Sequence, residues 1–138
     1  MNELKFNSQI CTTKEQSQRL LDLGLKPETA DMILIHNIFS NTYEPLPKAF
    51  PTDTKCYIPA WSLHRLIEIL PKIIRKIPLQ WYLSITPYYN NMISYEHCGN
   101  MASNYLYKSS FNDIYANIIS CIEWLISEDY FNKEYLKQ

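Results

Sequence analysis

The chain has three histidines, and one of them has a second potential metal ligand at helical spacing. Glu68 follows His64 by four residues, while His36 and His97 lie far away in the sequence. Side chains four residues apart share a helix face, so this pair could give two ligands to a zinc ion. No third ligand accompanies the pair, and we favour the simpler interpretation of an exposed imidazole beside a carboxylate. We therefore predict no metal site and no cofactor.

Other nucleophiles and carboxylates give no catalytic set. Cys98 directly follows His97, but neighbours on a strand point to opposite faces, so they cannot act as nucleophile and base. Glu96 and His97 are also neighbours on this strand, so their side chains point to opposite faces and cannot act together. Glu128 and Asp129 are adjacent at the end of a predicted helix, where solvated charge is the expected role. We predict no catalytic residues, and an enzyme built on a histidine is the weakest of three functional hypotheses.

The middle of the chain is basic and rich in tyrosine. Residues 55–108 hold six Lys and Arg against two Glu, although the whole chain has a net charge of −1. Tyrosine rings can stack on unpaired bases, so Lys72, Arg75 and Lys76 could help to bind single-stranded nucleic acid. The alternative, which we favour, is that these cations are the solvated side of a segment with inward-facing isoleucines. Those isoleucines would be Ile73, Ile74 and Ile77.

Aromatic residues are the other excess in the composition. The 138 residues include 11 Tyr, 5 Phe and 3 Trp, whereas 46% hydrophobic and 20% charged residues are ordinary for one folded domain over residues 1–138. Tyrosine joins an apolar body to a hydrogen-bonding tip, which suits a contact surface or the edge of a core. A protein-interaction surface is the leading hypothesis. The residues assigned to it are Trp61, His64, Tyr82, Tyr88 and Tyr89.

The cysteines and the N-terminal segment indicate the compartment. Cys11, Cys56, Cys98 and Cys121 show neither a C-x-x-C pair nor zinc-finger spacing, which predicts free thiols in a reducing cytoplasm. No signal-like apolar run follows the first residues, and no window has the length of a membrane span. We expect a cytoplasmic protein without membrane association.

The segment Ile58–Pro71 predicts a core helix over about 60–70. Pro59 suits the first helical position, where its missing N–H has no partner, and Pro71 ends the helix. Trp61 lies away from the centre of the apolar stripe and is expected at an edge of the core or against a neighbouring element. The stripe has the spacing i, i+3, i+4 and i+7. Its residues are Leu63, Leu66, Ile67 and Leu70.

Two more helices and a hairpin complete the predicted fold. A helix over about 13–23 begins where Thr12 and Glu15 have capping-box spacing, with Thr12 or Thr13 as its start. A second over about 111–127 has apolar residues at helical intervals. Alternating apolar and polar residues predict a β-hairpin at about 79–97. These elements predict an α+β fold in which helices cover a small antiparallel sheet.

The connections are less regular. Pro27 begins a short helical turn, and residues 32–38 are compatible with either a strand or a buried helix. A Pro-rich loop is predicted at about 40–58. Since the chain has only two glycines, asparagine is expected to supply many of the left-handed backbone conformations.

Two segments together resemble small uncharacterised proteins encoded by phages and mobile elements of gut bacteria. One runs from Cys11 through Leu23-Gly24-Leu25 to Met32, and the other is Ile58-Pro59-Ala60-Trp61-Ser62-Leu63. The similarity covers most of residues 11–127, although the Tyr-rich hairpin and the Pro-rich loop differ. It implies a phage or mobile-element origin and carries over no activity, cofactor or site residue.

The sequence therefore predicts a small cytoplasmic protein that works as a non-catalytic interaction or regulatory module. Its partner would be an unidentified protein, or a second copy of itself. Nucleic-acid association through the basic Tyr-rich middle is the alternative.

Overall fold

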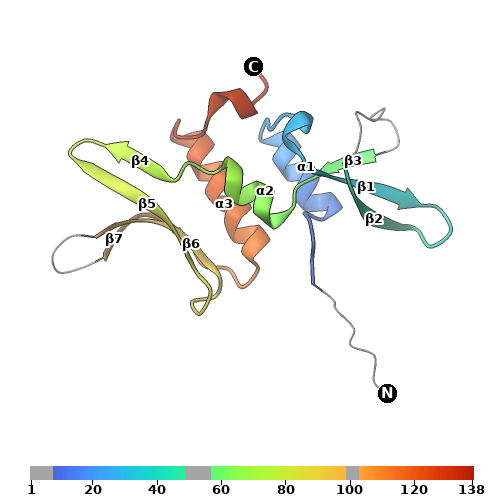
Figure 1. The fold of residues 1–138 in the computed structure, drawn as a ribbon, viewed down its shortest axis with the longest axis horizontal. Helices are drawn as coiled ribbons and strands as arrows, with labels where there is room; N and C mark the ends of the chain where they lie inside the picture. The colour runs from blue at the N-terminus through green and yellow to red at the C-terminus, as the bar shows by residue number, and fades with distance from the viewer. Residues whose placement is uncertain (1–7, 49–56, 99–102) are drawn as a thin grey trace.

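Two antiparallel sheets flank a central group of three helices in the computed structural model, which describes residues 8–48, 57–98 and 103–138 (Figure 1). The predicted α+β class is confirmed, with two sheets in place of one. In chain order the elements are α1 (Lys14–Asp22), the 3-10 turn η1 (Pro27–Thr29), β1 (Met32–Asn37), β2 (Thr42–Pro47), β3 (Tyr57–Ala60), α2 (Leu63–Ile69), β4 (Ile73–Lys76), β5 (Leu79–Thr86), β6 (Met92–Cys98), β7 (Ser103–Ser109), α3 (Ile114–Ser127) and the 3-10 turn η2 (Lys133–Tyr135).

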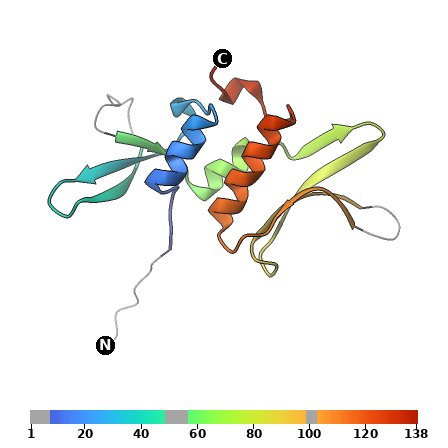
Figure 2. The same ribbon diagram turned by 180° about the vertical axis from the view of Figure 1, so that it is seen from behind.

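The sheets lie on opposite sides of the helices. The three-stranded sheet has the order β2-β1-β3, and the four-stranded sheet has the order β4-β5-β6-β7. The predicted hairpin is confirmed as β5 and β6, and β7 continues the meander. Seen from behind, α3 lies beside α2 and α1 at the centre and next to β6 and β7 (Figure 2). This packing covers one face of the four-stranded sheet.

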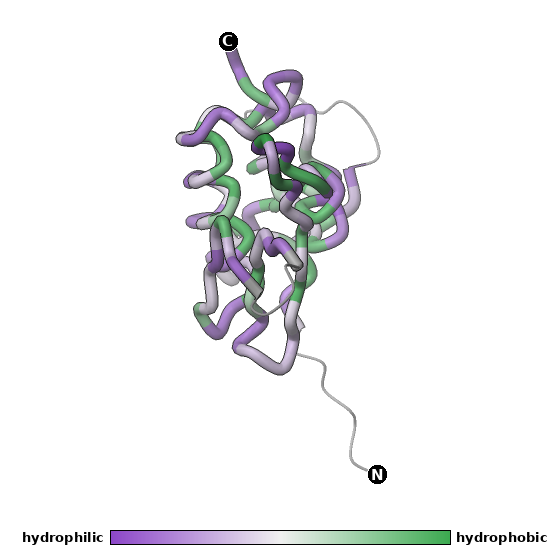
Figure 3. The backbone as a smooth tube through the Cα atoms, turned by 90° about the vertical axis from the view of Figure 1, so that its left-hand side faces the viewer, coloured by the Kyte–Doolittle hydropathy of each residue, from purple (hydrophilic) through white to green (hydrophobic). Residues whose placement is uncertain are grey.

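The main core lies between the helices and that covered sheet face. Cross-strand register puts Leu83, Tyr95 and Tyr107 in one row, all packed in this core. The helical turns in Figure 3 are hydrophobic on their inner side and hydrophilic on their outer side, as burial of one helical face requires. A smaller cluster of Cys11, Leu34 and Ala60 lies against the three-stranded sheet.

Helix α2 begins later than the sequence predicts. Ser62 is its N-cap, and Pro59 belongs to β3, where it pairs with Ile33. The prediction that Pro59 is the first helical residue is wrong because β3 is an edge strand, which tolerates a missing N–H as well as a helix start does. Trp61 is fully buried, so its assignment to an interaction surface is also wrong.

The other two helices lie within their predicted spans. The capping box of α1 joins Thr13 to Gln16, one residue after the predicted Thr12–Glu15 pair. Helix α3 begins three residues late, after the N-cap Asp113. The side chain of Asn117 accepts a hydrogen bond from the N–H of Phe111 and donates one to its carbonyl, which holds this residue outside the helix.

Several connections are more regular than predicted. Residues 32–37 form a strand, and β2 occupies part of the predicted loop at 40–58, with Pro45 and Pro47 tolerated on an edge strand. Residues 49–56 of that loop lie outside the described residues. As expected, asparagines take left-handed backbone conformations in turns. They are Asn41, Asn90 and Asn91.

Candidate functional site

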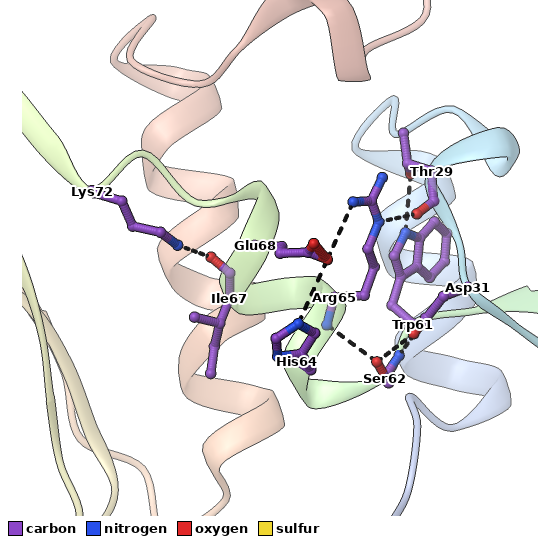
Figure 4. A network of polar contacts seen from close by, with 9 residues as sticks. All are labelled: Thr29, Asp31, Trp61, Ser62, His64, Arg65, Ile67, Glu68 and Lys72. Atoms are coloured by element: carbon purple, nitrogen blue, oxygen red, sulfur yellow. Dashed lines mark hydrogen bonds and ion pairs between the residues drawn. The ribbon is translucent and has the colours of Figure 1, made fainter.

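A polar network joins the start of α2 to the segment before β1 (Figure 4). The carboxylate of Asp31 accepts hydrogen bonds from the N–H of Ser62, at 2.8 Å, and from its hydroxyl. The Ser62 Oγ accepts in turn from the N–H of Arg65 at 3.1 Å, and the Arg65 Nε donates to the Thr29 carbonyl at 2.8 Å. Each group has a capping or bridging partner, so the network holds two segments together.

This network has no arrangement for nucleophilic catalysis. The Ser62 hydroxyl donates directly to a carboxylate, and no imidazole contacts it. His64 projects from α2 with 87% of its side chain exposed, and its Nε2 lies 3.9 Å from a Glu68 oxygen. His97 packs edge-on against the Trp81 indole at 5.6 Å between ring centroids. We infer that these histidines serve surface and packing roles.

The three cations predicted to contact nucleic acid do not form one surface. The Lys72 ammonium donates to the Ile67 carbonyl near the end of α2, where a cation stabilises the helix. Arg75 and Lys76 are neighbours in β4, so they point to opposite faces of the sheet.

The isoleucines of this segment are also placed differently from the prediction. Ile74 is buried, but Ile73 and Ile77 are exposed, so the interpretation that all three face inward is wrong. A strand rather than a helix end forms here, and strand residues alternate between the two faces.

We call the side of the four-stranded sheet that faces away from α3 the outer sheet face. Register places Tyr82, Glu96 and Tyr105 in one row across β5, β6 and β7. Tyr82 is 47% exposed and Tyr105 is 39% exposed. Tyr82 lies between the core residues Trp81 and Leu83 in β5, so its side chain emerges on the uncovered side. Glu96 and Tyr105 share this side through the register. No element of the described chain packs over this row.

A hollow of about 640 Å³ lies on the outer sheet face. Met92 is buried there, and Glu96 accepts a hydrogen bond from the fully buried Ser94 at 3.2 Å. The Lys108 ammonium lies 5.1 Å from the centroid of the Tyr105 ring. The hollow is lined by Ser84, Ile85, Thr86, Pro87, Tyr88, Tyr89, Met92, Glu96, Tyr105 and Lys108. It therefore combines aromatic walls with one acidic and one basic group.

The outer sheet face brings together part of the predicted interaction set. Tyr88 and Tyr89 line the hollow, and Tyr82 lies on the same face. Trp61 and His64 flank Ser62 at the start of α2, and neither lines this hollow. Tyr105 and Lys108 also line the hollow, although neither was among the predicted site residues. The alternation of residues 103–109 could have indicated a strand, but not which strand it pairs with.

A larger hollow, of about 710 Å³, lies between residues 8–15 and the β1–β2 hairpin. The His36 ring lies 2.9 Å from the Asn41 side-chain oxygen and packs on Tyr43. The Lys14 ammonium lies 4.9 Å from the centroid of that tyrosine ring. This hollow has one tyrosine in its lining, whereas three exposed tyrosines line the hollow on the outer sheet face, so we favour the outer sheet face as the candidate site.

Two cysteines are buried free thiols. Burial raises the pKa of Cys121 to about 12, and burial together with the nearby Asp31 carboxylate raises the pKa of Cys11. The thiolate is the reactive form, so neither group is suited to nucleophilic attack. Cys56 lies outside the described residues, as does the side chain of Cys98.

Iodoacetamide is expected to alkylate Cys121 only after unfolding. At pH 8, a pKa near 12 lowers the thiolate population on the order of a thousandfold relative to an ordinary cysteine, and burial also blocks access. Peptide mass spectrometry with and without urea measures this difference for the same residue. Equal alkylation rates in the two conditions would contradict the buried position of Cys121.

Among the residues that the structure describes, no group of three or more His, Cys, Asp or Glu side chains is arranged to hold a metal ion. Within the same residues, no helix combines the length and apolar character needed to cross a bilayer.

No protein-family model matches the chain, and comparison with curated proteins and with solved structures finds no match. The resemblance to phage and mobile-element proteins stays a prediction.

Proposed function

We propose that this chain is a non-catalytic interaction module that binds another protein on the outer sheet face. The observation that carries the proposal is the row of Tyr82 and Tyr105, both partly exposed on a face that no described element covers. Tyrosine side chains give large contact areas at low entropic cost, and they are enriched in protein interfaces. The adjoining hollow, with Tyr88 and Tyr89 in its walls, extends this surface.

The surface is well anchored, which lowers the entropic cost of binding. Its strands are held from behind by the core contacts of Tyr95 and Ile93 with α3. The Ser94–Glu96 hydrogen bond orients the central carboxylate. The free thiols of Cys11 and Cys121 support a reducing, cytoplasmic location.

Removal of the exposed tyrosines is expected to abolish partner binding without unfolding the protein. Wild-type chain and a Tyr82→Ala, Tyr105→Ala double variant would be immobilised and exposed to bacterial lysate, with retained proteins quantified by mass spectrometry. We expect the retained partner to fall at least about tenfold in the double variant, as loss of interface aromatics commonly causes.

Phe39→Ser is the matched control, because Phe39 is 97% exposed at the tip of the β1–β2 hairpin, in the other sheet. Circular dichroism checks the fold of each variant. Equal retention by the wild type and the double variant, or a strictly monomeric protein that retains nothing, would refute the proposal.

Two observations favour nucleic-acid association as the alternative function. Lys108 lies over the Tyr105 ring, and Arg75 shares the outer sheet face with Tyr82 through the β4–β5 register. Such cation and aromatic pairs suit single-stranded nucleic acid. Fluorescence anisotropy with a labelled single-stranded oligonucleotide at low salt tests this alternative. Salt-sensitive binding that Lys108→Glu and Arg75→Glu remove would favour it over a protein partner.

A further inference from the structure

Strand β7 is the sheet edge that is best suited to receive another strand. It has seven residues and no proline, and no described strand pairs with its far side. The opposite edge, β4, has four residues. The edge strands of the other sheet carry Pro45, Pro47 and Pro59, whose missing N–H groups interrupt a hydrogen-bonded ladder. A free edge of this kind is a template for an extended chain.

A third hollow, of about 600 Å³, lies along this edge between β7 and α3. Trp124 stacks on Tyr107 at 4.7 Å between ring centroids and an angle of 17°, and Phe111 is 62% exposed nearby. Glu123, which also lines the hollow, forms an ion pair with Arg19. Because the acidic group already has a cation, the aromatic walls favour an apolar side chain.

Strand β7 therefore separates two hollows. Lys108 lines both the hollow beside α3 and the hollow on the outer sheet face. It is the only formally charged residue of β7. The register shift opposite Tyr95 and Glu96 divides the strand, and its C-terminal part, Tyr107–Ser109, borders the hollow beside α3. A chain lying along this part would direct alternate side chains to the two sides of the sheet.

We propose that β7 binds an extended segment of a partner protein as a fifth strand of the sheet. The segment presents an apolar side chain to Tyr107, Phe111 and Trp124, and an acidic side chain to Lys108 on the other side. Main-chain hydrogen bonds to an edge strand provide affinity, and the alternating side-chain pockets provide selectivity. This inference rests on the proposed interaction function and names the form and chemistry of the partner.

Peptide selection tests the inference directly. The probe is a displayed library of random twelve-residue peptides, selected on the full immobilised chain. We expect enrichment of segments that alternate apolar and acidic residues, and NMR amide shifts centred on Tyr107–Ser109 when a selected peptide is added. Failure to enrich such peptides, or shifts confined to other elements, would overturn the proposal.

Peptide backbone methylation separates strand addition from side-chain contact alone. In an added strand, every second amide N–H faces β7 and the others face away. N-methylation of the amides that face β7 removes these donors and is expected to weaken binding at least about tenfold, whereas N-methylation of the amides that face away is tolerated. Equal binding of both methylated peptides would refute strand addition. If lysate partners still depend on Tyr82 and Tyr105 in that case, the proposed function stands and only the fifth strand is lost.

Surface variants complete the test. Phe111→Ser and Lys108→Glu are each expected to weaken binding of the selected peptide about tenfold, since they remove the apolar wall and reverse the charge. Phe39→Ser again serves as the exposed-phenylalanine control and should bind as the wild type does. Unchanged affinity in both β7-side variants would count against this site.

Discussion

Replacement of Asn117 by alanine is expected to lower the free energy of unfolding by about 3 kcal/mol or more. The side chain is fully buried at the start of α3. Its Oδ1 accepts hydrogen bonds from the Ser109 hydroxyl and from the Phe111 N–H, the latter at 2.6 Å. Its Nδ2 donates to the carbonyl groups of Asn90 and Asn91, as well as to that of Phe111.

Alanine would leave these donors and acceptors without partners in a buried site, and each unpaired group costs about 1–3 kcal/mol. Urea denaturation followed by circular dichroism measures the change, with an unchanged m-value as the check that folding stays two-state. Asn112→Ala is the matched control, because this asparagine is exposed, and we expect a change within about 0.5 kcal/mol. A loss below about 1 kcal/mol for Asn117→Ala would show that the hydrogen bonds of the Asn117 side chain contribute little to stability.

Asn117→Asp should add a pH dependence to the same measurement. The carboxylate would replace an amide donor that faces three carbonyl groups, so the folded state should favour the protonated acid and raise its pKa. A group with a raised pKa stabilises the fold below its unfolded pKa and loses that contribution as the pH rises. The variant is therefore expected to be more stable at pH 4 than at pH 7, relative to the wild type. The opposite trend would contradict the assignment of Nδ2 as the donor.

Trp61→Ala is expected to destabilise the fold by about 3–5 kcal/mol, as loss of a fully buried tryptophan does. The indole Nε1 donates to the Thr29 hydroxyl at 3.0 Å. The backbone of Trp61 is paired with Thr12 in both directions, through the Thr12 Oγ1 at 3.0 Å and the Thr12 N–H at 2.9 Å. This residue therefore ties α1, η1 and the start of α2 together.

Two companion variants separate the contributions of Trp61. Trp61→Phe keeps most of the buried volume but removes the hydrogen bond, so about 1–3 kcal/mol should be lost. Tyr88→Ala, at a highly exposed aromatic, should change stability by no more than about 0.5 kcal/mol. Thermal or urea unfolding followed by circular dichroism resolves these values. Similar stability of Trp61→Ala and Tyr88→Ala would mean that Trp61 is not a core residue in solution.

The local elements of this fold follow from periodicity. Apolar residues at helical intervals were enough to locate α1 and α3 to within three residues, because each helix buries one face over several turns. The alternation through residues 79–97 predicted β5 and β6 for the equivalent reason in a strand. The short strands β3 and β4 have no such pattern, and they exist because neighbouring strands supply their hydrogen bonds.

The candidate site depended more strongly on tertiary structure. Tyr82, Tyr88 and Tyr89 were assigned from composition, but Tyr105 and Lys108 joined them only through the β6–β7 register, which includes a shift at Tyr95/Glu96. A shift of one residue exchanges the two faces of a strand, so spacing alone cannot assign exposure when the register is unknown. The aromatic residues that line the hollow between β7 and α3 are likewise brought together only by tertiary structure.

In the segment from Ile58 to Pro71, the local sequence determines some features and tertiary packing determines others. Its sequence alone established a short amphipathic helix that ends before Pro71, because the apolar spacing and the proline act within one or two turns. Only the tertiary structure decided that Pro59 pairs with β1, that Trp61 is buried, and that Ser62 caps α2 through Asp31. The partner groups lie 31 or more residues away for Ser62 and Trp61, so packing in three dimensions, and not local preference, selects these contacts.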